Sequence, residues 1–194
     1  MTSKQELRKS ILQQRAKIAR PLLPDSGNAL VSVAQPIINS ITHPTTIALY
    51  ISMGTEISTL ELIHTLLLQR HTLLIPKLGT GKEIFWSELN SVEQLNNLQS
   101  INEHRPLEVH SNNLLPEELN NASHIFIPAL AIDQQGNRLG RGAAWYDQAL
   151  LHRNTHAQLY AICWDWELLP SVPTQKHDVP VQGAITNKQI VHFA

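Results

Sequence analysis

The chain has 194 residues, of which 42% are hydrophobic and 16% are charged, and its formal net charge is −1. This length and composition predict one globular domain of ordinary type. The near-neutral charge argues against nucleic acid or an anionic membrane as a partner, so any anion-binding site must be local. The single cysteine, Cys163, excludes an internal disulfide and a zinc cluster built from cysteines.

The first ten residues, MTSKQELRKS, are polar and charged. They lack the apolar run of a signal peptide, and no stretch of the chain is apolar enough to predict a membrane span. A lone cysteine suits a reducing compartment. These features predict a cytoplasmic protein.

Two helices are predicted before the first strand, over residues 4–20 and 29–41. Ser3 and Glu6 have the spacing of a capping box at the start of the first helix, whose apolar residues recur on one face. Pro36 is a possible kink in the second helix. The helical pattern is expected to break between them at two prolines, Pro21 and Pro24.

Short apolar runs predict the strands of a sheet. They cover residues 46–51, 72–75, 84–86, 124–127 and 158–163, with one or two more around Ile185 and 190–193. Pro76 and Pro128 are expected to end two of these strands, and Gly79-Thr-Gly-Lys82 is interpreted as a hairpin turn.

Helices are expected between the strands, from the Ser58 and Glu61 capping box to about Arg70 and over 143–153, with short helices and loops over 92–122. Alternating strands and helices predict one α/β domain over residues 1–194, with a mostly parallel sheet and helices on both faces.

The stretch GNRLGRGAAWYD, residues 136–147, follows a predicted strand and precedes a predicted helix. Ligands of α/β folds bind beyond the carboxyl ends of strands. Glycines let the backbone approach a ligand, and arginines offer fork-shaped donors to phosphate. The stretch is therefore either a phosphate-binding loop or a glycine turn whose arginines are solvated.

Three basic side chains, Lys4, Arg8 and Arg15, fall on one side of the first predicted helix, next to its apolar face. These three side chains, the basic ridge, either point into a cleft or face solvent.

Three carboxylates also lie near predicted element ends. Glu56 either pairs with a polar heterocycle or supports a helix N-terminus. Asp147 and Asp178 either help to hold Mg²⁺, which prefers oxygen ligands, or act as turn and cap residues.

Taken together, these segments resemble the 5-formyltetrahydrofolate cyclo-ligase family over nearly the whole chain. The matching pieces are Lys4-x-x-x-Arg8, Tyr50-Ile-Ser-Met-Gly-Thr-Glu56, Ile75-Pro76, Ile127-Pro-Ala-Leu-Ala-Ile-Asp133-x-x-Gly136-x-Arg138-Leu-Gly-Arg-Gly, Trp145-Tyr-Asp147 and His177-Asp178. The block from Ile127 to Asp147 is the most specific of them. The resemblance implies an enzyme that uses ATP to convert 5-formyltetrahydrofolate to 5,10-methenyltetrahydrofolate through a phosphorylated formyl group.

The same resemblance implies roles for individual residues. It implies that Arg141 stabilises the transferring phosphoryl group and that Asp147 and Asp178 help to hold Mg²⁺. It implies a folate pocket lined by Ile51, Glu56 and Trp145. The residues implied to bind ATP are Lys4, Arg8, Arg138, Leu139, Gly140, Arg141, Gly142, Ala143, Ala144, Trp145 and Tyr146.

The chain also departs from the family pattern. Ala143 and Ala144 stand where the family loop commonly has glycine or lysine and then glycine, and Trp145 replaces a tyrosine. Arg105-Pro106 replaces Glu-Pro, and Glu167 replaces a glutamine. The two alanines are harmless if they are helical, but a β-carbon at a position with positive φ is costly.

ATP and a reduced folate are therefore the expected partners of a protein that is expected to be monomeric. A folate- or nucleotide-binding protein without catalysis on the same scaffold is the alternative. A nucleic-acid-binding module is disfavoured because no basic and aromatic run is present.

Overall fold

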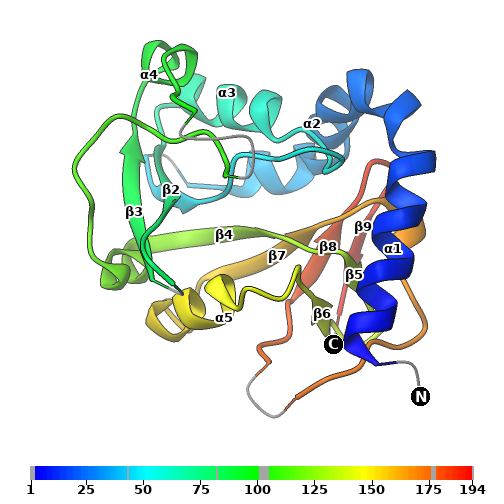
Figure 1. Cartoon of the computed structure of the whole chain (residues 1–194). Helices are drawn as coiled ribbons and strands as arrows, with labels where there is room; N and C mark the ends of the chain where they lie inside the picture. The colour runs from blue at the N-terminus through cyan, green and yellow to red at the C-terminus, as the bar shows by residue number, and fades with distance from the viewer. Residues whose placement is uncertain (1–2, 43, 82, 101–104, 176–177, 194) are drawn as a thin grey trace.

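The computed structural model describes residues 3–42, 44–81, 83–100, 105–175 and 178–193. A seven-stranded sheet forms its centre, in the order β3-β2-β1-β4-β7-β8-β9 (Figure 1). The five inner strands are parallel, and the edge strands β3 and β9 are antiparallel to their neighbours. The strands are β1 (Thr46–Ala48), β2 (Thr72–Leu78), β3 (Ile84–Leu89), β4 (Ala122–Pro128), β7 (Gln158–Ile162), β8 (Gly183–Ile185) and β9 (Ile190–His192).

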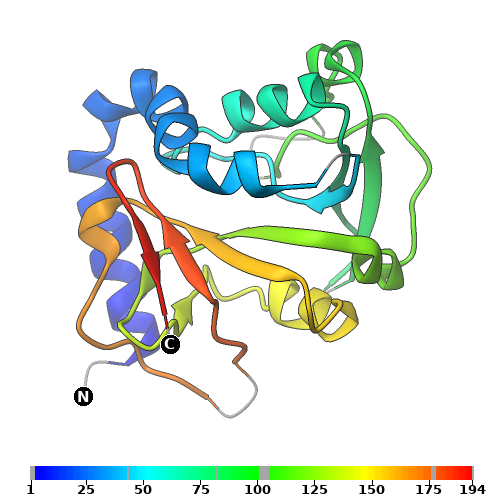
Figure 2. The ribbon, with the colours of Figure 1, turned by 180° about the vertical axis from the view of Figure 1, so that it is seen from behind.

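Helices cover both faces of the sheet, as the sequence predicts (Figures 1 and 2). One face packs against α2 (Leu23–Ser40) and α3 (Leu60–Leu68), and α4 (Val92–Asn96) lies beside α3. The opposite face is covered by the short α5 (Trp145–Ala149) and by two 3₁₀ turns, Pro116–Asn121 and Leu150–His152. Within the described ranges, no helix has the length and apolar content needed to cross a membrane.

The first helix, α1 (Lys4–Ile18), lies at one end of the sheet (Figure 1). It packs on a small hairpin of β5 (Ala131–Ile132) and β6 (Arg138–Leu139), which the sequence patterns did not predict. The contact is a separate apolar cluster that includes Ile11 and Leu139. This packing sets α1 beside the strands' carboxyl ends.

The capping box at the start of α1 is confirmed, because Ser3 Oγ accepts from Glu6 N and Glu6 Oε2 accepts from Ser3 N. The second helix begins at Leu23, six residues before the predicted start. Pro24 occupies its first turn, where a missing N–H costs nothing. The prediction that this proline separates the helices is therefore wrong. Pro36 lies inside α2.

The prediction that Pro76 ends a strand is also wrong, because β2 continues to Leu78. Pro76 faces Trp86 across the β2–β3 pair, and the backbone N–H and C=O of Trp86 both bond to Leu114. Pro76 therefore sits at a position of the ladder that requires no donor. Gly81, with φ +62°, lies in the predicted hairpin turn between these strands, and Lys82 of the same turn lies outside the described residues.

At the start of α3, Ser58 and Glu61 bond to each other at 2.6 Å, and Thr59 is the N-cap residue. The predicted reciprocal capping box is thus replaced by a direct side-chain contact. The Thr59 hydroxyl instead donates to Tyr50 O at 2.7 Å and accepts from Ser52 N at 3.0 Å. These bonds fix the loop between β1 and α3.

The helix predicted over 143–153 begins two residues later, at Trp145, and changes to a 3₁₀ turn at Leu150. Ala144 is the reason, because its φ of 59° and ψ of 16° place it in the left-handed region. Gly142 also has a positive φ, of 103°, whereas Ala143 does not. The backbone of Ala144 therefore carries the steric cost that a glycine would avoid.

A buried ion pair joins α1 to the far end of the chain. Arg15 Nε and Nη2 donate to the two carboxylate oxygens of Glu167 at 2.5 and 2.8 Å, and Nη2 also donates to Ala129 O at 2.6 Å. The two side chains are only 2% and 1% exposed. Burial lowers the pKa of Arg15, but the hydrogen bond and charge of Glu167 outweigh it and raise that pKa overall. Both side chains are charged, and two parallel N–H···O bonds join the guanidinium to the carboxylate.

Removing either partner of this pair leaves a buried charge without compensation. We expect Arg15→Met and Glu167→Leu each to lower the free energy of unfolding by about 3–5 kcal/mol. The double variant should lose less than the sum of the two, because it buries no lone charge. Urea unfolding of the four proteins measures this coupling, and additive losses would contradict it.

Ala143 and Ala144 are adjacent alanines, of which only Ala144 has a positive φ, so the same substitution at both positions tests the backbone geometry. Ala144→Gly should raise the free energy of unfolding by about 0.5–1 kcal/mol, because glycine adopts positive φ without the β-carbon clash. Ala143→Gly should lower it by about 0.4–1 kcal/mol, because only the unfolded chain gains freedom. Thermal unfolding of both variants tests the backbone geometry, and the same sign for both would contradict it.

Candidate active site

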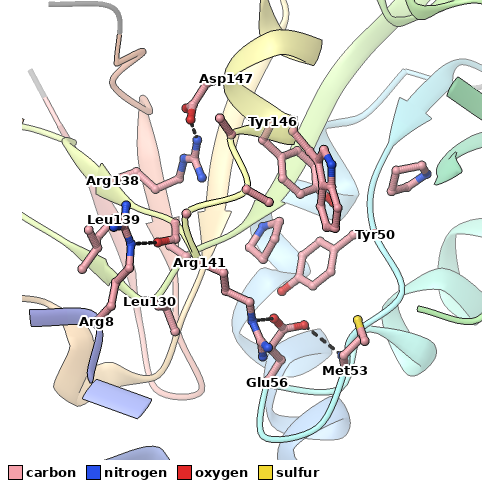
Figure 3. A pocket seen from close by; sticks show the side chains of 18 of the residues that line it. Arg8, Tyr50, Met53, Glu56, Leu130, Arg138, Leu139, Arg141, Tyr146 and Asp147 are labelled. Carbon is pink, nitrogen blue, oxygen red and sulfur yellow. Dashed lines mark hydrogen bonds and ion pairs between the residues drawn. The ribbon is translucent and has the colours of Figure 1, made fainter. Parts of the chain in front are cut away.

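All of the residues to which the family resemblance gives a role line one pocket, at the carboxyl ends of the parallel strands. Figure 3 shows part of this pocket. These residues come from α1, from the loop after β1, from the continuous segment that runs from β6 into α5, and, for Asp178, from the loop before β8. The predicted residues that line it are Lys4, Arg8, Ile51, Glu56, Arg138, Leu139, Gly140, Arg141, Gly142, Ala143, Ala144, Trp145, Tyr146, Asp147 and Asp178.

The basic ridge of α1 does not face solvent, and its members have two different environments. Lys4 and Arg8 line the pocket, whereas Arg15 is buried in its pair with Glu167. Arg8 Nε donates to Gly140 O at 2.8 Å, so α1 holds the glycine loop directly. Glycine suits position 142 because φ there is 103°, and a β-carbon would also lie 3.3 Å from the guanidinium carbon of Arg8.

Arg138 lies beneath the loop, on β6, and is only 9% exposed. Its Nη2 donates to Asp147 Oδ1 at 2.7 Å (Figure 3). Burial lowers the pKa of this guanidinium, and the carboxylate of Asp147 partly opposes that effect. Arg138 Nε is buried without a hydrogen-bond partner among the described residues. The group retains an unused donor next to the loop.

Asp178 forms the second carboxylate pair of the pocket. Lys4 Nζ donates to Asp178 Oδ2 at 2.7 Å, and that oxygen also accepts from Gln175 N at 2.7 Å. The adjacent His177 lies outside the described residues. Asp178 therefore both caps a turn, as one of the two predicted alternatives has it, and lines the pocket.

The pocket's carboxylates do not form a closed metal cage. In the described part of the chain, no group of three or more histidine, cysteine, aspartate or glutamate side chains could hold a metal ion. Asp147 and Asp178 both lie close enough to Arg138 to influence its pKa. Such a donor set suits Mg²⁺, which takes one or two protein carboxylates and completes its shell with phosphates and water.

Glu56 lies on the opposite side of the pocket and is 8% exposed. Its Oε2 accepts from Met53 N at 2.9 Å, and its Oε1 accepts from Arg141 Nε at 3.1 Å (Figure 3). The Arg141 side chain is 48% exposed, so water can hydrate its guanidinium when it leaves this contact. The Glu56–Arg141 pair joins the glycine loop to the loop after β1.

Two aromatic side chains follow the glycine loop. Trp145 Nε1 donates to Gly81 O in the β2–β3 turn at 3.1 Å, which brings that turn against the pocket. Burial raises the pKa of Tyr146 far above its usual range, so its hydroxyl stays protonated. Arg105 also binds this turn, donating from Nη2 to Leu78 O and, at 3.1 Å, to Gly79 O.

Several other lining residues received no role from the sequence, because they are apolar or uncharged. Six of them lie inside the matching motif pieces, whose positions were the only signal. The lining residues without a role are Tyr50, Met53, Pro76, Leu78, Pro106, Pro128, Ala129, Leu130 and Gln175.

Chemically, the pocket combines four cationic side chains with three carboxylates in one partly buried space. Each cation bonds to a carboxylate or to a backbone carbonyl of the pocket itself. An anionic ligand with several oxygens can replace these internal partners, and a neutral donor can replace Arg141 at Glu56. The arrangement suits a polyphosphate beside a polar ring.

Comparison with known proteins gives one consistent family. The family model described as "5-formyltetrahydrofolate cyclo-ligase family" matches residues 1–187. The 5-formyltetrahydrofolate cyclo-ligase of Mycolicibacterium smegmatis is 30% identical over 193 residues, which cover 96% of this chain and 95% of that protein. The enzyme of the same name from Haemophilus influenzae is 30% identical over 184 residues, with coverage of 92% and 94%.

Solved structures agree at the level of the fold. The NMR structure of Aquifex aeolicus 5,10-methenyltetrahydrofolate synthetase has a TM-score of 0.76 at 22% identity and covers 97% of this chain and 92% of that one. The corresponding synthetase from Mycoplasma pneumoniae has a TM-score of 0.72 at 19% identity, with coverage of 96% and 100%. From the full-length family match and these relatives, the chain belongs to the 5-formyltetrahydrofolate cyclo-ligase family.

Proposed function

We propose that the protein uses ATP to convert 5-formyltetrahydrofolate to 5,10-methenyltetrahydrofolate, with release of ADP and phosphate. The observation that carries this proposal is the Glu56–Arg141 contact of 3.1 Å. It joins a glycine loop rich in cations to a buried carboxylate in one pocket. A phosphoryl donor bound at the glycine loop and a polar heterocycle bound at the carboxylate would therefore lie next to each other. Membership of the family supports the choice of the two substrates.

The reaction needs a better leaving group than an amide oxygen. In the proposed reaction, the formyl oxygen attacks the γ-phosphorus of ATP, and ADP departs. The N10 atom of the folate then attacks the activated formyl carbon and loses its proton. The oxygen leaves with the phosphate, and the methenyl bridge remains. Little covalent catalysis is required of the protein, so positioning and charge stabilisation account for the rate.

Phosphate binding is assigned to α1 and to the glycine loop. Lys4 and Arg8 contact phosphate oxygens, and residues 138–146 surround the triphosphate. Arg141 stabilises the charge on the transferring phosphoryl group, because it is exposed enough to move between Glu56 and a ligand. The left-handed Ala144 turns the chain from this loop into α5.

Magnesium is part of the proposal, and the residues present fit an ion that is bound mainly by the nucleotide. Asp147 and Asp178 would hold it from the protein side. When bound, the ion neutralises charge on the phosphates. Arg138 and Lys4, which pair with these carboxylates in the free protein, are then available to phosphate oxygens.

Folate binding is assigned to the loop after β1. Glu56 accepts hydrogen bonds from N–H groups of the pterin, and its 8% exposure makes each bond to the charged oxygen strong. Ile51 contributes an apolar wall, and Trp145 offers a broad aromatic face. The protein is further proposed to act as a monomer in the cytoplasm, without nucleic acid or membrane partners.

The activity itself gives the first test. With Mg-ATP and 5-formyltetrahydrofolate, the absorbance of the methenyl product should rise, and chelation of the magnesium should stop it. A family enzyme run beside it serves as the positive control. Folded protein that binds both ligands in calorimetry but forms no product would favour the alternative, a binding protein without catalysis.

Arg141 gives the second test. Arg141→Ala should lower kcat at least about 100-fold, because a charge that acts on the transferring group is lost. Its melting temperature should stay close to that of the wild type, because the Arg141 side chain is 48% exposed and Glu56 keeps its hydrogen bond from Met53 N. Arg20→Ala, an exposed arginine outside the pocket, is the matched control and should retain full turnover. Near-normal turnover of Arg141→Ala would reject the assigned role.

A further inference from the structure

Tyr50 is a pocket residue that neither the family resemblance nor the proposed reaction assigns a role. It follows β1 directly, lines the pocket and is 3% exposed. Its backbone C=O accepts from the Thr59 hydroxyl at 2.7 Å, which fixes the backbone at this position. The side chain points across the pocket floor, with its hydroxyl toward the Glu56–Arg141 pair (Figure 3).

The Tyr50 hydroxyl is buried and has no hydrogen-bond partner among the described residues. A buried hydroxyl without a partner costs about 1–3 kcal/mol, and such groups are rare in folded proteins. Tyr50 also lies in a pocket, where a ligand can supply the missing partner. An apolar phenyl ring would fill the same space without this penalty, so the hydroxyl is costly in the free protein.

The surroundings of the hydroxyl indicate which ligand group it meets. Burial is the main cause that raises the pKa of Tyr50, and the nearby Glu56 carboxylate raises it further. The hydroxyl therefore stays protonated and acts as a donor. It lies on the Glu56 side of the pocket, whereas the Lys4–Asp178 and Arg138–Asp147 pairs belong to the phosphate side.

We infer that Tyr50 is a further substrate-binding residue, whose hydroxyl donates a hydrogen bond to a carbonyl oxygen of the formylated folate. This inference rests on the proposed function for the identity of that ligand. A formylated pterin carries two such oxygens, one on the ring and one on the formyl group. Glu56 accepts hydrogen bonds from the ring's N–H groups, and Tyr50 donates one to a carbonyl oxygen. The two side chains therefore recognise donors and acceptors of the folate, respectively.

The test is Tyr50→Phe, which removes one oxygen and keeps the ring. The KM for 5-formyltetrahydrofolate should rise about tenfold, the effect of one lost hydrogen bond, with the KM for ATP unchanged. The melting temperature of the free protein should equal or exceed that of the wild type, because an unpartnered buried hydroxyl is gone. Opposite effects on folate binding and on stability are the signature of a ligand contact.

Tyr160→Phe is the matched control. Tyr160 lies in β7, stacks on Phe126 with ring centroids 5.9 Å apart, and does not line the pocket. Removing the Tyr160 hydroxyl should leave the KM for 5-formyltetrahydrofolate and the KM for ATP unchanged. A change in folate KM for this variant equal to that of Tyr50→Phe would overturn the inference.

Two further results would overturn the inference. An unchanged folate KM in Tyr50→Phe would show that the hydroxyl does not contact the substrate. A lowered melting temperature would show that it is already bonded in the free protein. If the wild-type protein proves inactive, calorimetric titration with 5-formyltetrahydrofolate replaces the KM. Equal affinities of wild type and Tyr50→Phe, or no binding by either, then reject the role of Tyr50, and the absent turnover separately rejects the proposed reaction.

Discussion

The pocket depends on one buried ion pair, between Arg15 and Glu167. The carboxylate of Glu167 accepts both guanidinium bonds and also the backbone N–H of Trp164 at 2.9 Å. Trp164 in turn donates from its indole to Thr55 O at 2.8 Å, one residue before Glu56. A single carboxylate thus fixes α1, which carries Lys4 and Arg8, and supports the loop that carries Glu56. Charged partners suit this position because their forked geometry sets an orientation that apolar packing leaves free.

The pocket itself is organised by exchangeable charge pairs. Lys4, Arg138 and Arg141 each hold a carboxylate, and Arg8 holds a backbone carbonyl. Each cation thus has at least one partner within the protein, and these bonds hold the glycine loop in place. Under the proposed function, ligand binding replaces one set of hydrogen bonds with another. Preorganisation of this kind lowers the ordering cost of binding.

The order of strands and helices and the residues around the pocket could be predicted from the sequence, since periodicity and a family-like block of motifs both point to them. Conformations that depend on distant partners could not. Pro76 continues a strand because Trp86 bonds elsewhere, and Ala144 adopts positive φ although its sequence neighbours favour a helix. Tyr50 begins one of the matching motif pieces but received no role from it, and the burial of its hydroxyl without a partner is what draws attention to it. Tertiary context decides each of these cases.

The Arg15–Glu167 pair also constrains the order in which the chain acquires its structure. The two residues are separated by 152 positions, so α1 and its ion-pair partner are far apart along the chain. Closing so long a loop is slow compared with forming the local strand and helix units. Until then, Arg15 remains hydrated, and α1 carries an apolar face without its cluster on the β5–β6 hairpin. The binding pocket is therefore among the last parts of the protein to be completed during folding.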